Sequence, residues 1–109
     1  MTIIDYTTAG GKNLIMEYLR KLPEIERTEG YLIRQKIRTD GVDALGSLNT
    51  RQLKGKLWEI KFFHNRIMYV LCHKDKIYFL HACKKQKNKA EKFELEKALK
   101  RAKEEGLLT

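Results

Sequence analysis

Four basic residues between positions 61 and 85 have the side chains needed to cleave RNA without a metal: Lys61, Arg66, His81 and Lys85. Such cleavage requires a base for the 2′-OH proton, cations that balance the charge growing on the phosphate, and an acid that protonates the leaving 5′-oxygen. The 2′-OH is itself the nucleophile, so no serine or cysteine triad is needed. We therefore interpret these four residues as candidate catalytic residues.

Each of these side chains suits a particular task. Arg66 can clamp a phosphate with its forked guanidinium. His81 titrates near neutral pH and can pass a proton in either direction. Lys61 can stabilise charge on the phosphate, or act as a base if neighbouring cations lower its pKa. The alternatives are that Lys61 and Arg66 are solvated charges at a sheet edge, and that His81 is a half-buried strand histidine.

Charge is distributed unevenly along the 109 residues. Residues 1–50 hold seven basic and seven acidic side chains, whereas residues 51–109 hold sixteen and seven, so the whole net charge of +9 lies in the second half. This asymmetry favours a polyanionic partner, RNA or DNA, bound through its phosphates with release of counterions. The alternative is a basic surface that only aids solubility. The lysine run at Lys84, Lys85, Lys87 and Lys89 is accordingly either a phosphate-binding patch or a solvated linker.

The stretch from Leu53 to Lys89 is expected to form the antiparallel sheet that positions the four candidates. If His64-Asn65 and Lys74-Asp75 are its turns, alternation places an apolar set on one face: Trp58, Ile60, Phe62, Ile67, Tyr69, Leu71, Tyr78, Leu80 and Ala82. On the opposite face, Lys61 and His81 then flank Met68, and Arg66 lies opposite Cys83. We expect helices to cover the apolar face and leave the cationic face to RNA.

The flanking segments are predicted to be mainly helical. Ile3, Ile4 and Tyr6 suit a short opening strand, and apolar spacing predicts helices over residues 12–22 and 24–39, separated by Pro23. A C-terminal helix is expected from an N-cap at Asn88 to Gly106. The sequence thus predicts one α+β domain over residues 1–109, with an N-terminal helical hairpin packed on a small antiparallel sheet and a C-terminal helix.

Several classes of protein are not expected. No apolar run is long enough to span a membrane and no secretion signal opens the chain, which predicts a cytoplasmic protein without membrane contact. Cys72 and Cys83 are interpreted as reduced residues that fill strand positions. The histidines at 64, 73 and 81 lack the spacing of metal ligands, so we expect neither a metal nor a cofactor.

Three blocks of the sequence resemble the RelE/HigB toxin superfamily, most closely its phage-protein-like HigB branch. They are Leu53-Lys54-Gly55-Lys56-Leu57-Trp58-Glu59-Ile60, Arg66-Ile67-Met68-Tyr69 and Leu80-His81-Ala82-Cys83-Lys84-Lys85, followed by a basic C-terminal helix. The resemblance implies a RelE-like fold and the toxin of a type II toxin–antitoxin system. Such a toxin is an mRNA endoribonuclease (an mRNA interferase) that inhibits translation and growth, in many members on the ribosome. The implied partner is a small HigA-like antitoxin with a helix-turn-helix, through which alone the toxin would contact operator DNA.

By position, the resemblance implies that Lys61, Arg66 and Lys85 bind or activate the scissile phosphate. We also assign RNA binding to five further lysines, namely Lys54, Lys56, Lys84, Lys87 and Lys89. Glu59 stands where RelE has a lysine, and Phe93 is the nearest match to a RelE tyrosine, so the general acid and base remain unassigned. Two alternatives stay open: a ParE-like gyrase poison on the same fold, and a non-catalytic module that binds RNA or DNA.

Overall fold

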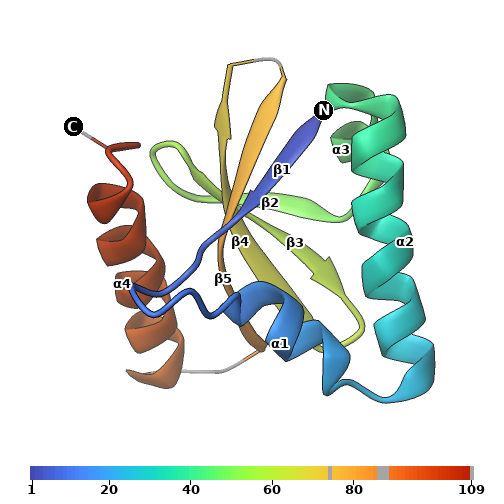
Figure 1. Ribbon diagram of the computed structural model, residues 1–109, viewed down its shortest axis with the longest axis horizontal. Helices are drawn as coiled ribbons and strands as arrows, with labels where there is room; N and C mark the ends of the chain where they lie inside the picture. The colour runs from blue at the N-terminus through green and yellow to red at the C-terminus, as the bar shows by residue number, and fades with distance from the viewer. Residues whose placement is uncertain (74, 86–88, 109) are drawn as a thin grey trace.

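The computed structural model describes residues 1–73, 75–85 and 89–108, without the side chains of residues 89 and 90. Its elements, in chain order, are β1 (Thr2–Asp5), α1 (Leu14–Arg20), α2 (Glu24–Asp40), α3 (Val42–Ser47), β2 (Thr50–Lys54), β3 (Leu57–Phe62), β4 (Asn65–Cys72), β5 (Lys76–Lys84) and α4 (Lys89–Glu104). The fold is therefore α+β, as the sequence predicts (Figure 1). None of the described helices is both long enough and apolar enough to cross a membrane.

The strands form one mixed sheet in the order β1-β5-β4-β3-β2. The β1 strand runs parallel to β5, whereas the other neighbours are antiparallel. The expectation of a purely antiparallel sheet is thus wrong at this edge. The segment between α2 and β2 contains the short helix α3.

Helices cover both faces of the sheet. The helices α1, α2 and α3 lie on one side and α4 on the other (Figure 1). Six consecutive residues of β4, from 65 to 70, are buried, which requires cover on both faces because side chains alternate along a strand. The predicted open cationic face is therefore wrong: α4 covers most of it.

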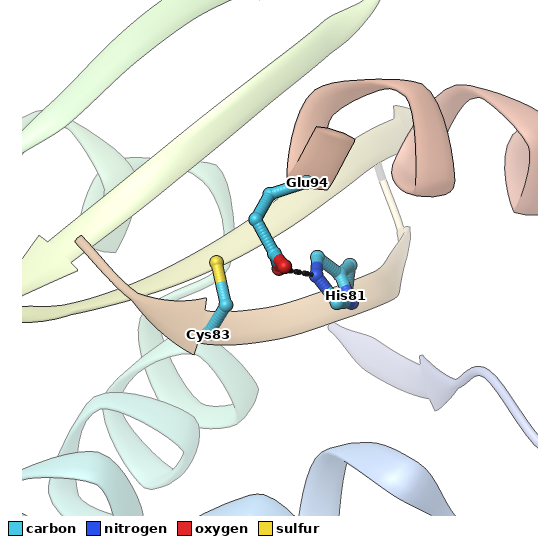
Figure 2. Close-up of side chains that lie close together, drawn as sticks. All are labelled: His81, Cys83 and Glu94. Carbon is cyan, nitrogen blue, oxygen red and sulfur yellow. Dashed lines mark hydrogen bonds and ion pairs between the residues drawn. The ribbon is translucent and has the colours of Figure 1, made fainter. Parts of the chain in front are cut away.

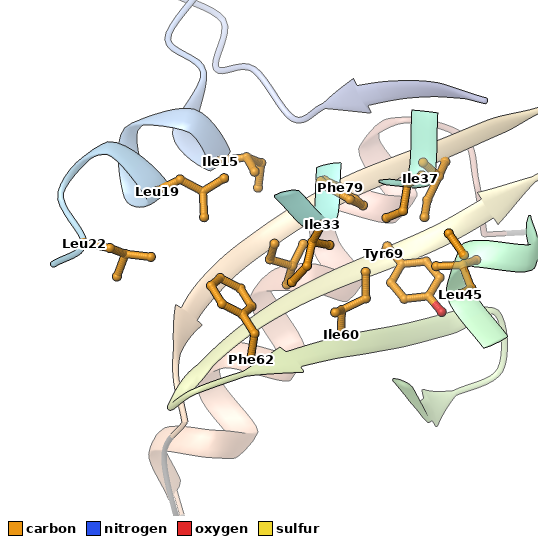
Figure 3. Close-up of a cluster of buried hydrophobic side chains, with 13 residues drawn as sticks. Ile15, Leu19, Leu22, Ile33, Ile37, Leu45, Ile60, Phe62, Tyr69 and Phe79 are labelled. Atoms are coloured by element: carbon orange, nitrogen blue, oxygen red, sulfur yellow. The ribbon is translucent and has the colours of Figure 1, made fainter. Parts of the chain in front are cut away.

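The larger core lies between the sheet and the first three helices (Figure 3). It joins Ile15, Leu19, Ile33 and Ile37 of α1 and α2 to Ile60, Phe62, Ile67, Tyr69, Ile77 and Phe79 of the sheet. Gly30 allows α2 to approach closely, because a Cβ at this position would lie 2.9 Å from Leu19 Cδ2 and 3.4 Å from Phe62 Cζ. The helical cover expected for Ile60, Phe62, Ile67 and Tyr69 is confirmed.

A smaller core lies beneath α4. Ala98 and Ala102 of this helix pack against Leu57, Met68, Val70, Leu80 and Cys83. The small alanine side chains let the helix lie close to the strands.

A β-bulge in β5 explains why part of the predicted alternation fails. Met68 pairs with His81, but the next residue, Tyr69, pairs with Phe79, so Leu80 is an extra residue. An extra residue reverses the alternation of every side chain on one side of it. Phe79 therefore enters the larger core, while Tyr78 and Leu80 turn toward α4, opposite to their predicted face.

The turn between β3 and β4 is formed by residues 63 and 64, one residue earlier than predicted. Lys61 therefore pairs with Arg66, and Glu59 pairs with Met68. The predicted placement of Lys61 beside Met68 is wrong. The partner of each β3 residue on β4 thus differs by two residues from the predicted one, and because this number is even each side chain keeps its predicted face. The predicted pairs of Arg66 with Cys83 and Met68 with His81 are confirmed.

A buried ion pair ties the N-terminal strand to α2. The Arg34 guanidinium donates to both carboxylate oxygens of Asp5, over 2.7 and 2.8 Å, and Asn13 Nδ2 donates to Asp5 Oδ2 over 3.0 Å. Only 6% of the Arg34 side chain and 9% of the Asp5 side chain are exposed. Removal of either partner would leave a buried charge without compensation.

We expect Asp5→Ala to lower the free energy of unfolding by about 3 kcal/mol, because it strands the Arg34 charge in the protein interior. Urea denaturation measures this loss. Glu17→Ala is the matched control, since it removes a carboxylate paired at the surface with Lys21 and should cost much less. Equal losses in the two variants would contradict a structural role for the buried pair.

Candidate active site

The centre of the candidate site is a buried pair between neighbouring strands. Arg66 Nε donates to Glu59 Oε1, and the exposed fractions of the two side chains are 1% and 0%. Arg51, opposite Glu59 on β2, places Nη2 2.9 Å from Glu59 Oε2. Two guanidinium groups thus flank one buried carboxylate, which needs such cationic partners in the protein interior.

Glu91 of α4 closes the outer side of this pair. Its Oε1 atom lies 3.4 Å from Arg66 Nη2 and 3.6 Å from Arg51 Nη2. Arg66 Nη1 is buried and has no hydrogen-bond acceptor within the part of the chain that the structure describes. The phosphate clamp predicted for Arg66 is therefore not open to solvent while Glu91 holds this position.

Lys61 and Lys85 place two ammonium groups together at the edge of the cluster. Lys61 pairs with Arg66 on the neighbouring strand, and the Lys85 backbone N–H donates to His64 O over 2.7 Å, which fixes Lys85 beside the β3–β4 turn. Partial burial and the adjacent Lys85 ammonium lower the pKa of Lys61, although Glu59 opposes the shift. A lysine with a lowered pKa is the kind that can accept a proton.

His81 lies further along the same side of the sheet and is held by α4 from two directions. Its Nε2 atom is hydrogen-bonded to Glu94 (Figure 2). Its Nδ1 atom lies 2.9 Å from Arg101 Nη1. Arginine can only donate, so Nδ1 accepts and the proton of the neutral ring is on Nε2, facing Glu94. Burial lowers the pKa of His81, against the opposing effect of Glu94, so the ring is neutral at neutral pH.

Cys83 completes a cluster of three potential metal ligands. Its Sγ atom, the ligand nitrogen of His81 and a carboxylate oxygen of Glu94 lie within 4.8 Å of one another (Figure 2). Burial, reinforced by Glu94, raises the pKa of the Cys83 thiol to about 12. For Glu94, burial alone would raise the pKa, but hydrogen bonds from His81 and Cys83, together with the charge of Lys97, overcome this effect and lower it.

The donor types suit zinc, but the surroundings of His81 do not. Zinc on Nε2 would require the ring proton to move to Nδ1, where it would meet the N–H groups of Arg101. Metal-bound histidines usually direct their second N–H at an acceptor instead. The arrangement therefore fits a hydrogen-bond network, in which His81 of β5 is bonded to Glu94 and Arg101 of α4, better than a metal centre.

The remaining predicted site residues are dispersed. Lys54 and Lys56 are exposed around the β2–β3 turn, at the far end of β3 from Lys61. Lys84 extends to the opposite side of the sheet, where Nζ lies 2.9 Å from Asn65 Oδ1 and 3.4 Å from Glu26 Oε1. Lys87 and the Lys89 side chain lie outside the described residues, as does the predicted N-cap Asn88.

Sequence reasoning brought Lys61, Arg66 and Lys85 to one place, but missed Arg51, Glu91, Glu94 and Arg101. One signal was present for Arg51. Glu59 sits in an apolar strand, and a buried carboxylate requires a cationic partner. No comparable signal identifies Glu91 or Glu94, because on sequence alone both belong to an ordinary charged helix.

A comparison with protein-family models finds that residues 17–103 are similar to a family described as "Phage derived protein Gp49-like (DUF891)". The matched range begins in α1 and ends in α4, so it includes every charged residue of the cluster. No curated protein gives a significant match to the chain.

The lowered pKa of His81 predicts a pH dependence of stability. As pH falls, the unfolded chain binds the histidine proton near its ordinary pKa of 6.5, before the folded chain does. The contribution of His81 to the free energy of unfolding is therefore complete above about pH 6.5 and is lost as pH falls below this value. We expect His81→Gln, which retains a donor for Glu94, to remove this loss.

Urea unfolding at a series of pH values measures this effect. Glu94 acts in a lower window, below its ordinary pKa of 4.5, because its own pKa is lowered in the folded state. Between pH 6.5 and 4.5, the free energy of unfolding of His81→Gln should therefore change less with pH than that of the unsubstituted protein. Parallel curves across this window would contradict the burial of a neutral His81.

Proposed function

The chain belongs to the Gp49-like family of phage-derived proteins, which is associated with toxins of toxin–antitoxin systems, and we propose that it is the toxin of such a pair. In this proposal the chain has a RelE-like fold of the HigB branch and cleaves mRNA, on the ribosome or free, to stop translation and growth. Its partner is a small antitoxin protein with a helix-turn-helix.

The observation that carries the catalytic part of the proposal is the placement of Lys61 and Lys85 near the β3–β4 turn, beside the Arg51–Arg66 cluster. In the proposed reaction, Lys61 takes the proton from the 2′-OH, whose oxygen attacks the adjacent phosphorus. The P–O5′ bond breaks, and the Lys85 ammonium gives a proton to the leaving oxygen. The products are a 2′,3′-cyclic phosphate and a 5′-hydroxyl. The surrounding cations stabilise charge on the phosphate in the transition state.

His81 has a different role in this proposal. Its ring is buried, neutral and bonded through both nitrogens, so it has no free position from which to exchange a proton with a substrate. We therefore propose that His81 positions α4 against β5 and does not act on RNA directly.

We expect induction of the protein to arrest growth and to produce discrete breaks in cellular mRNA, detected by primer extension. Lys61→Ala and Lys85→Ala should each lower cleavage by about 10²- to 10⁴-fold, the usual contribution of a general base or acid. Lys36→Ala is the matched control, since it removes one exposed lysine from α2, outside the cluster, and should leave cleavage unchanged.

Two outcomes would contradict the endoribonuclease. Intact mRNA together with gyrase-dependent breaks in DNA would identify a gyrase poison. RNA binding without cleavage, with and without ribosomes, would identify a binding module. Growth arrest that no co-expressed helix-turn-helix protein from the neighbouring reading frame relieves would count against the antitoxin partner.

A further inference from the structure

We propose that the Glu91 carboxylate occupies a phosphate-binding position formed by Arg51 and Arg66, and that an RNA phosphate takes its place. The inference rests on the proposed function in that RNA is the ligand. It adds Arg51 as a binding residue and gives Glu91 the role of an internal competitor.

The two carboxylates of the cluster are held in different ways. Glu59 is fully buried, and each of its oxygens lies against a different arginine, Arg66 or Arg51. Glu91 is 39% exposed, and its contacts of 3.4 and 3.6 Å are longer than charge-assisted hydrogen bonds. Glu59 is thus a fixed part of the sheet, whereas the Glu91 side chain can leave at little cost.

The guanidinium groups can accept such a ligand once Glu91 withdraws. Arg51 is 52% exposed, so the position between its Nη2 and that of Arg66 is reachable from solvent. The buried Nη1 group of Arg66 also donates no hydrogen bond to any of the described residues. A buried donor without an acceptor is costly, so a ligand that satisfies it gains affinity.

A phosphodiester matches the position chemically. It carries one negative charge, as the Glu91 carboxylate does, so the exchange leaves the local charge unchanged. Its two non-bridging oxygens can accept from both arginines, in the geometry that guanidinium groups prefer. Lys61 and Lys85 then lie on the adjacent side of the same cluster, where a neighbouring sugar would meet them.

The test compares Glu91→Gln with Glu96→Gln. Both changes remove one negative charge from α4, but Glu96 is exposed and makes no ion pair with the described residues of the cluster. The probe is a fluorescent 2′-O-methyl oligoribonucleotide, which binds but lacks the nucleophile for cleavage. By fluorescence anisotropy, Glu91→Gln should bind about fivefold more tightly than Glu96→Gln, which reports only the general effect of charge.

A second comparison assigns the gain to Arg51. In an Arg51→Ala background, Glu91→Gln should give no more affinity than Glu96→Gln, because the position has lost one of its two cations. Equal affinities of the two single variants would overturn the proposal, as would a gain that persists without Arg51, or no binding by Glu91→Gln. Cleavage is measured separately on unmodified RNA, and its absence would refute the proposed enzyme without affecting this result.

Discussion

The ion pair between Glu59 and Arg66 constrains the rest of the structure. Two buried charges on adjacent strands are tolerated only when each compensates the other, and the loss of either would leave a costly charge in the interior. Because of this pair, the part of the β3–β4 hairpin nearest its turn is polar on the face that α4 covers. Toward the other end, Leu57, Met68 and Val70 offer an apolar surface that the small residues of α4 can cover. The helix thus rests on the apolar part and meets the charged part with its first turns.

The candidate site lies at the boundary between the apolar and the charged part of this face, where α4 no longer covers the sheet. Lys61, Lys85 and Arg51 remain accessible at this boundary, while Arg66 supplies charge from beneath. The hydrogen bonds from Glu94 and Arg101 to His81 hold the helix in place beside the cluster. A chain with excess positive charge in its second half therefore concentrates part of that charge at one edge of the sheet, rather than over an open face.

Alternation along the strands predicted the faces of β3 and β4 correctly, together with the pairing of Arg66 with Cys83. It failed at Leu80, because a bulge inserts one residue without any local change in composition. It also could not show that α4 covers the second face, since the alanines that make close packing possible are unremarkable in sequence. Arg51 and Glu91 meet through tertiary packing alone, so no spacing along the chain could have joined them to Arg66.

We propose that this cluster cleaves RNA through the 2′-OH, with lysines in place of a metal. The most direct measurement is the chemistry of the ends of RNA fragments, produced by the purified protein in a translating extract, or on free RNA with a chelator present. We expect 2′,3′-cyclic phosphates and 5′-hydroxyls, which should be absent from the Lys61→Ala reaction. Fragments that end in 3′-hydroxyls and 5′-phosphates, or equal cleavage by Lys61→Ala, would contradict it.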